Sequence, residues 1–148
     1  MPSPLRIAVH SPAPAGAAAV IDAGLDEYNT AAAPLSDVHP LHVVAEDADG
    51  MVVGGAIGRT WGQCCELQQL WVTPKLRANR IGSQLMDAFE QGARRRGCLL
   101  VYLDTFSFQA PGFYRARGYD EALRIDGFTD GIIKFTMQKR LHANHTAS

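Results

Sequence analysis

A helix-like segment between two strand-like runs most constrains how this chain folds. Over residues 81–93, apolar side chains recur at helical spacing and form one stripe, and Gly97 then provides a helix stop. The run before it, 64–72, and the run after it, 98–103, both have strand length. The second is apolar throughout, as expected of a strand that is covered on both faces. This order predicts a sheet with a helix packed on it.

Apolar periodicity predicts the other elements. A helix is expected at 15–28 and a short helix-like segment at 109–117. Asp49-Gly50 between two strand-like runs is typical of a hairpin turn. The predicted strands are 5–9, 41–46, 51–57, 64–72, 98–103, 119–125 and 132–141. Helices interleaved with these strands predict an α/β (α+β) fold, in which helices flank one sheet.

Length and composition suit one domain without structural metals or disulfides. The chain has 148 residues, of which 47% are apolar and 20% charged. We expect one domain over 1–141 and a polar C-terminal tail over 142–148. The three cysteines form no C-x-x-C pair, so we expect no metal site and a reducing compartment. No apolar run is long enough for a membrane helix, and the start lacks the basic segment of a signal peptide. A cytoplasmic protein without a membrane partner is therefore predicted.

Charge is divided unevenly along the chain, although the formal net charge is only −1. Residues 1–74 hold two basic and eight acidic side chains, and residues 75–148 hold twelve basic and seven acidic ones. The net charge argues against a nucleic-acid partner, so a nucleic-acid binder is the less favoured reading. We expect an anionic ligand to bind the second half. The acidic first half would favour a cationic substrate.

The segment between the 64–72 run and the 81–93 helix is a candidate anion site. Lys75, Arg77 and Arg80 lie in this short loop. The first N–H groups of a helix have no intrahelical partner, and the helix dipole is positive there, so a pyrophosphate is a suitable ligand. The segment matches neither a Walker loop nor a dinucleotide-binding fingerprint. The alternative is an ordinary turn with basic surface side chains.

Two motifs resemble those of the GNAT family of acyl-CoA-dependent N-acyltransferases. The family's loop pattern, [Q/R]-x-x-G-x-[G/A], stands here as residues 77–82, with Arg80 in place of the usual glycine. A second pattern, Asn-x-x-Ala-x-x-x-Tyr-x-x-x-Gly-[Phe/Tyr], stands as residues 107–119, with Ser107 in place of the Asn. Residues 104–109, Asp-Thr-Phe-Ser-Phe-Gln, also resemble a run found in one bacterial subgroup of the family.

The resemblance implies a fold and a cofactor site. The GNAT fold has a mixed, mostly antiparallel central sheet whose strands splay apart where acetyl-CoA binds. Main-chain groups of the 67–72 strand would then bond the pantetheine arm, and the loop N–H groups would hold the pyrophosphate. Ser107 would contact the cofactor, or else cap the following helix. The implied cofactor-binding residues are Leu70, Trp71, Val72, Arg77, Ala78, Asn79, Arg80, Ile81, Gly82, Ser83, Ser107 and Tyr114.

Two catalytic roles also follow from the resemblance. Tyr114 stands where the family places a general acid near the leaving thiolate, and its alternative is a packed aromatic side chain. Glu66 stands at the offset of a glutamate base in histone-acetyltransferase-like members. An edge carboxylate facing solvent is the alternative for Glu66, and Asp104 or a water molecule are other candidates for the base.

The resemblance implies an enzyme that transfers an acetyl group from acetyl-CoA to a primary amine by direct attack in a ternary complex. The acceptor would be a small molecule or a peptide, and homodimers are frequent in the family. The alternative function is a non-catalytic acyl-CoA sensor or interaction module, in which the same loop binds the cofactor without turnover. The presence of both Glu66 and Tyr114 favours the enzyme.

Overall fold

The computed structural model describes residues 3–142, and the chain divides into two compact units after Leu35. The predicted tail, 142–148, lies outside the described residues from position 143 onward. A single domain over 1–141 stays a prediction. None of the helices within residues 3–142 is long and apolar enough to cross a membrane.

The first unit contains one α-helix within residues 3–35, α1 (Ala17–Ala32). The helix predicted at 15–28 is confirmed, and it continues to Ala32 because Ala33 turns to an extended conformation before Pro34. The strand predicted at 5–9 is wrong, since residues 3–10 have no regular secondary structure. A strand needs a neighbouring strand for its backbone hydrogen bonds, and the described residues of this unit include none.

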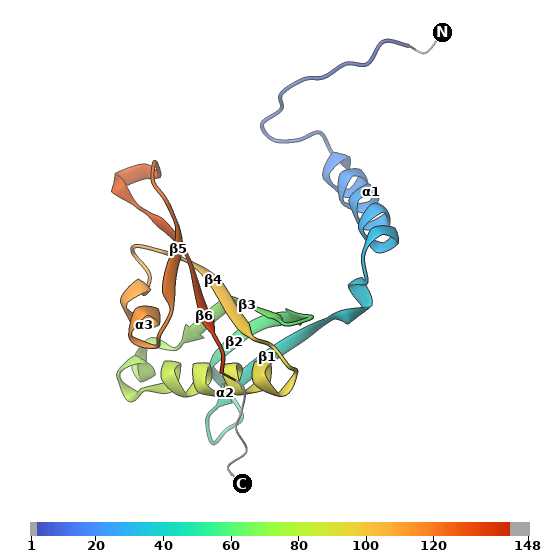
Figure 1. The fold of residues 1–148 in the computed structure, drawn as a ribbon. Coiled ribbons are helices and arrows are strands. Elements are labelled where there is room, and N and C mark those ends of the chain that lie inside the picture. The colour runs from blue at the N-terminus through green and yellow to red at the C-terminus, as the bar shows by residue number, and fades with distance from the viewer. Residues whose placement is uncertain (1–2, 143–148) are drawn as a thin grey trace. The chain divides into compact units, whose positions relative to one another are not determined.

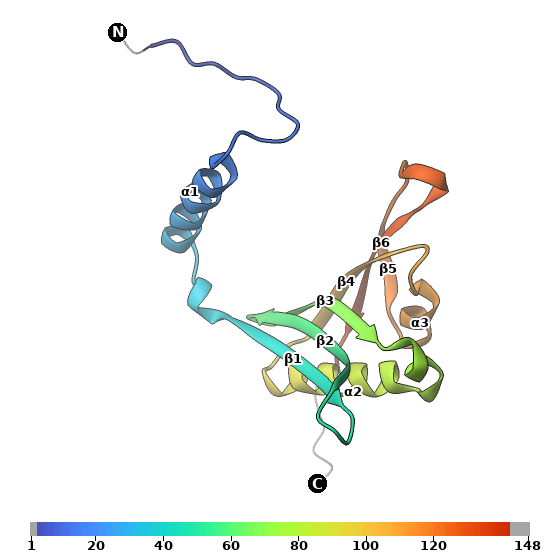
Figure 2. The same ribbon diagram turned by 180° about the vertical axis from the view of Figure 1, so that it is seen from behind.

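The second unit is built on one six-stranded sheet, with strand order β1-β2-β3-β4-β6-β5 (Figures 1 and 2). All neighbouring strands are antiparallel except β3 and β4, which confirms the predicted mixed, mostly antiparallel sheet. The six remaining predicted strands are confirmed, the one at 64–72 with its predicted ends and the other five with shifted ends. The strands are β1 (Val38–Glu46), β2 (Val52–Trp61), β3 (Cys64–Val72), β4 (Leu100–Phe106), β5 (Asp120–Ile125) and β6 (Lys134–Arg140). The 3-10 helices are η1 (Leu35–Asp37), η2 (Pro74–Asn79) and η3 (Thr129–Gly131).

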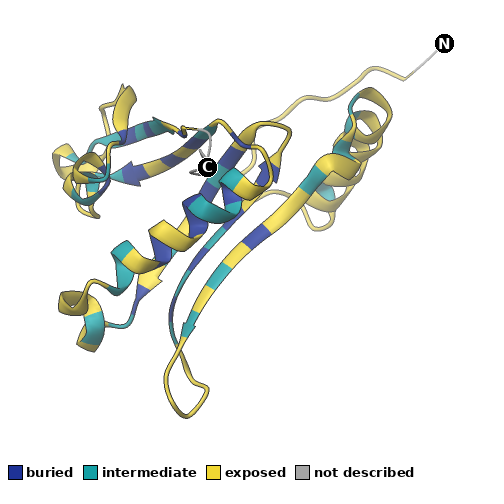
Figure 3. Cartoon of the chain, turned by 60° about the horizontal axis from the view of Figure 1, so that its bottom comes forward, coloured by how far each residue is buried: buried dark blue, intermediate teal, exposed yellow. Residues whose placement is uncertain are grey.

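The helix α2 (Ile81–Arg95) packs on one face of the sheet, as its apolar stripe predicts (Figure 3). Leu85 and Phe89 belong to the buried stripe, and Phe89 is fully buried. A Cβ atom at Gly58 would stand 2.6 Å from the Phe89 ring, so the glycine in β2 lets the helix approach the strand closely. The helix therefore fixes the position of the β2–β3 half of the sheet.

The strands β3 and β4 separate along their length. Their parallel pairing covers four residue pairs and ends where Leu67 meets Leu103. Beyond that point β3 keeps β2 as its neighbour on one side, and β4 pairs with β6. The short helix α3 (Pro111–Ala116) follows β4. The predicted splay of the sheet is therefore present, and it leaves one edge of β3 without a strand partner.

A buried ionic cluster joins the two halves of the splayed sheet. Glu90, on α2, is 2% exposed. Its carboxylate lies 2.6 Å from the Lys139 Nζ of β6 and 3.3 Å from Arg117 Nη2, and it accepts a hydrogen bond of 3.1 Å from the Tyr119 hydroxyl. Burial, and next the charge of Glu90, raise the pKa of Tyr119, so this hydroxyl stays a donor. The cluster ties α2 to the residues that follow α3 and to β6.

We predict that Glu90→Ala destabilises the protein strongly. The substitution leaves the largely buried Arg117 and Lys139 cations without their shared anion, at a cost of about 3 kcal/mol in the free energy of unfolding. Urea denaturation measures this change. Asp87→Ala is the matched control, because it removes the exposed carboxylate that also pairs with Arg117, for at most about 1 kcal/mol. Equal losses in the two variants would contradict a joining role for Glu90.

Candidate active site

The loop between β3 and α2 is held by its own backbone and by one arginine. Arg77 folds back, and its Nε donates a hydrogen bond of 3.0 Å to the Val72 carbonyl at the end of β3. The Leu76 N–H donates to the Thr73 carbonyl at 3.0 Å. Arg80 then stands just before α2 in the left-handed region, with φ 60° and ψ 20°. The loop is thereby fixed to the end of β3, and α2 begins directly after it.

A cavity of about 410 Å³ lies along this loop. It is lined by the end of β3, the loop, the first turn of α2, and two residues at α3, Ala110 and Phe113. Eight of the predicted cofactor residues line it: Leu70, Trp71, Val72, Arg77, Ala78, Arg80, Gly82 and Ser83. Asn79 and Ile81 do not, and Ile81 packs against the core instead. The basic side chains and helix N-terminus suit a diphosphate, so the residues present fit acetyl-CoA.

The left-handed backbone of Arg80 explains why the GNAT pattern usually has glycine at this position. A positive φ strains any residue with a Cβ atom and is free of strain for glycine. The helix nevertheless begins at Ile81 with Arg80 in that conformation. Arginine at this position therefore keeps the backbone strain that glycine would avoid. It adds a positive charge at the mouth of the cavity.

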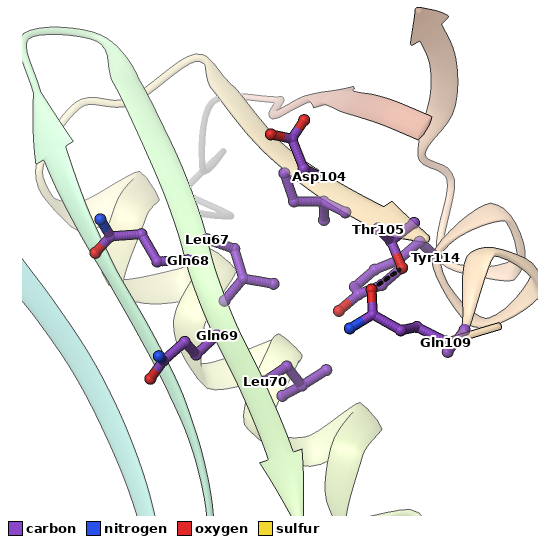
Figure 4. Close-up of a pocket in the computed structure, with 10 residues that line it drawn as sticks. Leu67, Gln68, Gln69, Leu70, Asp104, Thr105, Gln109 and Tyr114 are labelled. Carbon is purple, nitrogen blue, oxygen red and sulfur yellow. Dashed lines mark hydrogen bonds between the residues drawn. The ribbon is translucent and has the colours of Figure 1, made fainter. Parts of the chain in front are cut away.

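A second cavity, of about 270 Å³, lies between β3 and β4 (Figure 4). Tyr114 of α3 lines it together with Leu67, Leu70 and Thr105. The Tyr114 ring is packed edge-to-face against Phe113 and Tyr119, with centroids 5.2 and 5.7 Å away. Burial raises the pKa of Tyr114 to about 12. The two cavities share Leu70 and Ala110, so the Tyr114 cleft adjoins the cavity along the loop.

The two candidate carboxylates lie in different places. Asp104, at the end of β4, lines the Tyr114 cleft, accepts a hydrogen bond of 2.6 Å from Thr136, and lies 3.6 Å from the Lys134 Nζ. Glu66 lies in the paired part of β3 and does not line the cleft. Its carboxylate accepts a 2.9 Å hydrogen bond from Arg59 Nε. The structure therefore brings Asp104, and not Glu66, to the same cavity as Tyr114.

Ser107 forms two hydrogen bonds with the backbone of Ile133. Its Oγ accepts a hydrogen bond of 3.0 Å from the Ile133 N–H, and its own N–H donates to the Ile133 carbonyl at 2.8 Å. The alternative of a helix cap is wrong, because Ala110 is the N-cap of α3 and no side chain caps that helix. Ser107 lines neither of the two cavities, and it ties the loop after β4 to the start of β6.

Gln109, Ala110 and Phe113 are among the lining residues to which sequence reasoning gave no site role. Gln109 faces the Tyr114 cleft, Phe113 faces the loop cavity, and Ala110 lines both. Gln109 is the last residue of the Asp-Thr-Phe-Ser-Phe-Gln run, so the run itself contained the signal. Within residues 3–142, no group of three or more His, Cys, Asp and Glu side chains lies close enough together to hold a metal ion.

Comparison with known proteins agrees with this geometry. The family model described as "Acetyltransferase (GNAT) domain" matches residues 39–121, more than half of the chain. The chain belongs to the GNAT acetyltransferase family. It is therefore an acyltransferase enzyme, and GNAT enzymes use acetyl-CoA. The match begins in β1 and ends in β5, so it contains the loop, α2 and the Tyr114 cleft.

Individual GNAT relatives show the same likeness. The chain is 35% identical over 112 residues to blasticidin-S acetyltransferase of Streptomyces morookaense, covering 73% of this chain and 82% of that protein. It is 30% identical over 113 residues to an acetyltransferase of Agrobacterium fabrum, covering 76% and 82%. A crystal structure of an acetyltransferase from Bacillus cereus superposes with a TM-score of 0.75 at 28% identity, covering 91% of this chain and 98% of the other.

We predict that Arg80→Gly weakens CoA binding only modestly. The substitution removes an exposed charge worth about 1 kcal/mol, so Kd rises about fivefold in calorimetric titration with CoA. Arg80→Ala is the matched control, because it loses the same charge but keeps the strain of a Cβ atom at φ 60°. The two variants should share one Kd, and the alanine variant should be the less stable by about 1 kcal/mol. Abolished binding in the glycine variant would show that this loop works differently.

Proposed function

We propose that this GNAT enzyme transfers the acetyl group of acetyl-CoA to a primary amine by direct attack in a ternary complex. The observation that supports this most is the meeting of two cavities at Leu70 and Ala110. One cavity has the basic loop and the helix N-terminus, and the other has the Tyr114 hydroxyl. A ligand with a diphosphate at one end and a thioester at the other spans both.

The free edge of β3 holds the pantetheine arm in this proposal. Beyond Leu67, β4 no longer pairs with β3, so the N–H and C=O groups on that edge have no strand partner. Leu70 and Val72 lie in this stretch and line the loop cavity. Extended ligands add to free strand edges through main-chain hydrogen bonds. The N–H groups of residues 80–83 and the side chains of Lys75 and Arg80 then hold the diphosphate.

Tyr114 assists the departure of the sulfur. Acetyl-CoA supplies a reactive thioester, whose C–S bond breaks as the amine attacks. A thiol has an ordinary pKa of about 8.5, far below that of a phenol whose pKa is raised to about 12. Complete proton transfer from Tyr114 to the thiolate is therefore uphill. The hydroxyl acts as a hydrogen-bond donor that stabilises the negative sulfur.

Asp104 is the carboxylate best placed to receive the proton of the amine, directly or through water. It lines the cleft opposite β3, whereas Glu66 is paired with Arg59 outside the cleft. The attacking amine must be neutral, so a nearby proton acceptor raises the rate. A small polar amine fits the cleft, because Gln68, Gln69 and Gln109 line it beside Asp104. The blasticidin-S acetyltransferase relative supports an antibiotic-like amine as the acceptor class.

We predict that the protein releases free CoA when it is mixed with acetyl-CoA and a suitable primary amine. A panel of blasticidin S, polyamines, amino acids and peptides, followed by thiol detection, measures this.

Tyr114→Phe should lower kcat by about tenfold or more while KM for acetyl-CoA changes little. The buried hydroxyl stays protonated at pH 10, so the alkaline limb up to that pH should be the same in both proteins.

Three outcomes separate the possibilities. CoA release that needs both substrates supports the proposal. Acetyl-CoA binding without release by any amine would favour the non-catalytic acyl-CoA module. An alkaline loss of rate near pH 10 that is absent from Tyr114→Phe would show that Tyr114 ionises in its ordinary range.

We predict that Asp104→Asn lowers kcat more than Glu66→Gln does. Each variant replaces a carboxylate by an amide of the same shape, so the pair is matched. The Asp104 variant should lose about a hundredfold in kcat at constant pH. The Glu66 variant should lose about threefold or less at the same pH. The reverse order would assign the base to Glu66, and an unchanged kcat in both would assign it to water.

A further inference from the structure

The carboxamide of Gln109 is fixed in one orientation. The Phe106 N–H donates a hydrogen bond of 2.8 Å to the Gln109 Oε1, and the Thr105 hydroxyl lies 3.4 Å from the same oxygen. A backbone N–H can only donate, so its partner must be the amide oxygen and not the amide nitrogen. The orientation of this side chain is therefore decided by chemistry. Thr105, which is 3% exposed, provides a rigid second contact.

With the oxygen anchored to β4, the amide nitrogen projects into the cleft (Figure 4). It points to the same side as the Tyr114 hydroxyl, toward β3, and both residues line the cavity. Within residues 3–142, the structure gives this nitrogen no hydrogen-bond partner, so both of its N–H groups are free to donate. Two hydrogen-bond donors on separate elements thus converge where the sulfur of a bound thioester would lie.

The leaving sulfur can accept hydrogen bonds from more than one donor. A hydroxyl that keeps its proton offers the departing sulfur one hydrogen bond, and burial holds Tyr114 in that state. A thiolate accepts several hydrogen bonds, and donors already in position stabilise developing charge without reorganising. The anchored Gln109 amide meets this requirement, because its orientation is set before substrate binds.

We propose that Gln109 is a catalytic residue whose amide N–H donates a hydrogen bond to the departing sulfur of acetyl-CoA, beside the Tyr114 hydroxyl. This inference rests on the proposed function. In the step, the amine nitrogen bonds to the acetyl carbon, the C–S bond breaks, and its electron pair leaves with the sulfur. The amine proton passes to Asp104 or water. The thiolate stays hydrogen-bonded to both donors and takes its proton from solvent.

Gln109 also anchors the loop after β4, and the experiment must separate that structural role from donation. Gln109→Glu keeps an oxygen to accept from the Phe106 N–H but replaces the donor with a carboxylate. Gln109→Ala removes both functions. Gln63→Ala is the control, because this glutamine is exposed in the turn between β2 and β3 and lines neither cavity.

We expect Gln109→Ala to lower kcat by about tenfold. Gln109→Glu should lower kcat by about a hundredfold at pH 8, because the carboxylate of the new glutamate repels the thiolate. The KM for acetyl-CoA should change less than about threefold, since the donor acts mainly on the charged sulfur. A protonated glutamic acid regains an O–H donor. The kcat of Gln109→Glu relative to wild type should therefore rise as the pH falls from 8 toward 5. Gln63→Ala should match wild type.

Other outcomes overturn the inference. Wild-type kcat in Gln109→Glu with a loss only in Gln109→Ala, together with a lowered melting temperature, would make Gln109 a loop anchor alone. A raised KM for the amine at unchanged kcat would place the amide on the acceptor. Failure of the proposed function itself is distinguishable, because the wild-type protein would then release no CoA with any amine while still binding acetyl-CoA.

Discussion

The structure depends on where the β3–β4 pairing ends. Only four residue pairs join these parallel strands, and after Leu67 and Leu103 the two diverge. A free strand edge is usually a liability, because its unpaired N–H and C=O groups invite another strand. In this fold the edge lies inside a cleft that a narrow, extended ligand can enter. The same break in the sheet therefore creates both the binding edge and the cavity.

A sheet interrupted at its centre needs another connection between its halves. The cluster around Glu90 provides one, since a carboxylate on α2 meets cations and a hydroxyl from the other half. A buried ion cluster is a costly means of adding stability but a specific means of setting position. Tyr119 belongs to that cluster and packs against Tyr114. The position of the Tyr114 hydroxyl thus follows from the contact that holds the halves together.

Much of this arrangement could be predicted from the sequence, because local patterns specify it. The apolar stripe of α2, the basic loop and the Tyr114 motif are each one continuous stretch of the chain. The structure buries the stripe, and it places the loop and Tyr114 on two adjoining cavities. The strand predicted at 5–9 is wrong, because apolar composition alone does not provide a neighbouring strand for it to pair with. Ser107 lines neither cavity, whereas Gln109 lines one although its sequence position predicted no site role. Which side chain of the run 104–109 enters the cleft is decided by the path of the loop relative to β6 and β4.

The uneven division of charge along the chain explains less about the site than the sequence suggests. The basic second half does supply the loop beside the larger cavity, as the sequence suggests. The acidic first half does not supply the cleft, because none of the carboxylates in residues 3–74 lines it. The single acidic residue that lines the cleft, Asp104, belongs to the second half and lies beside Lys134. Net charge over a segment therefore says little about an acceptor site, where one carboxylate and its neighbours set the local field. In the proposed reaction, recognition of the amine would depend on hydrogen-bond geometry around Asp104 more than on long-range attraction.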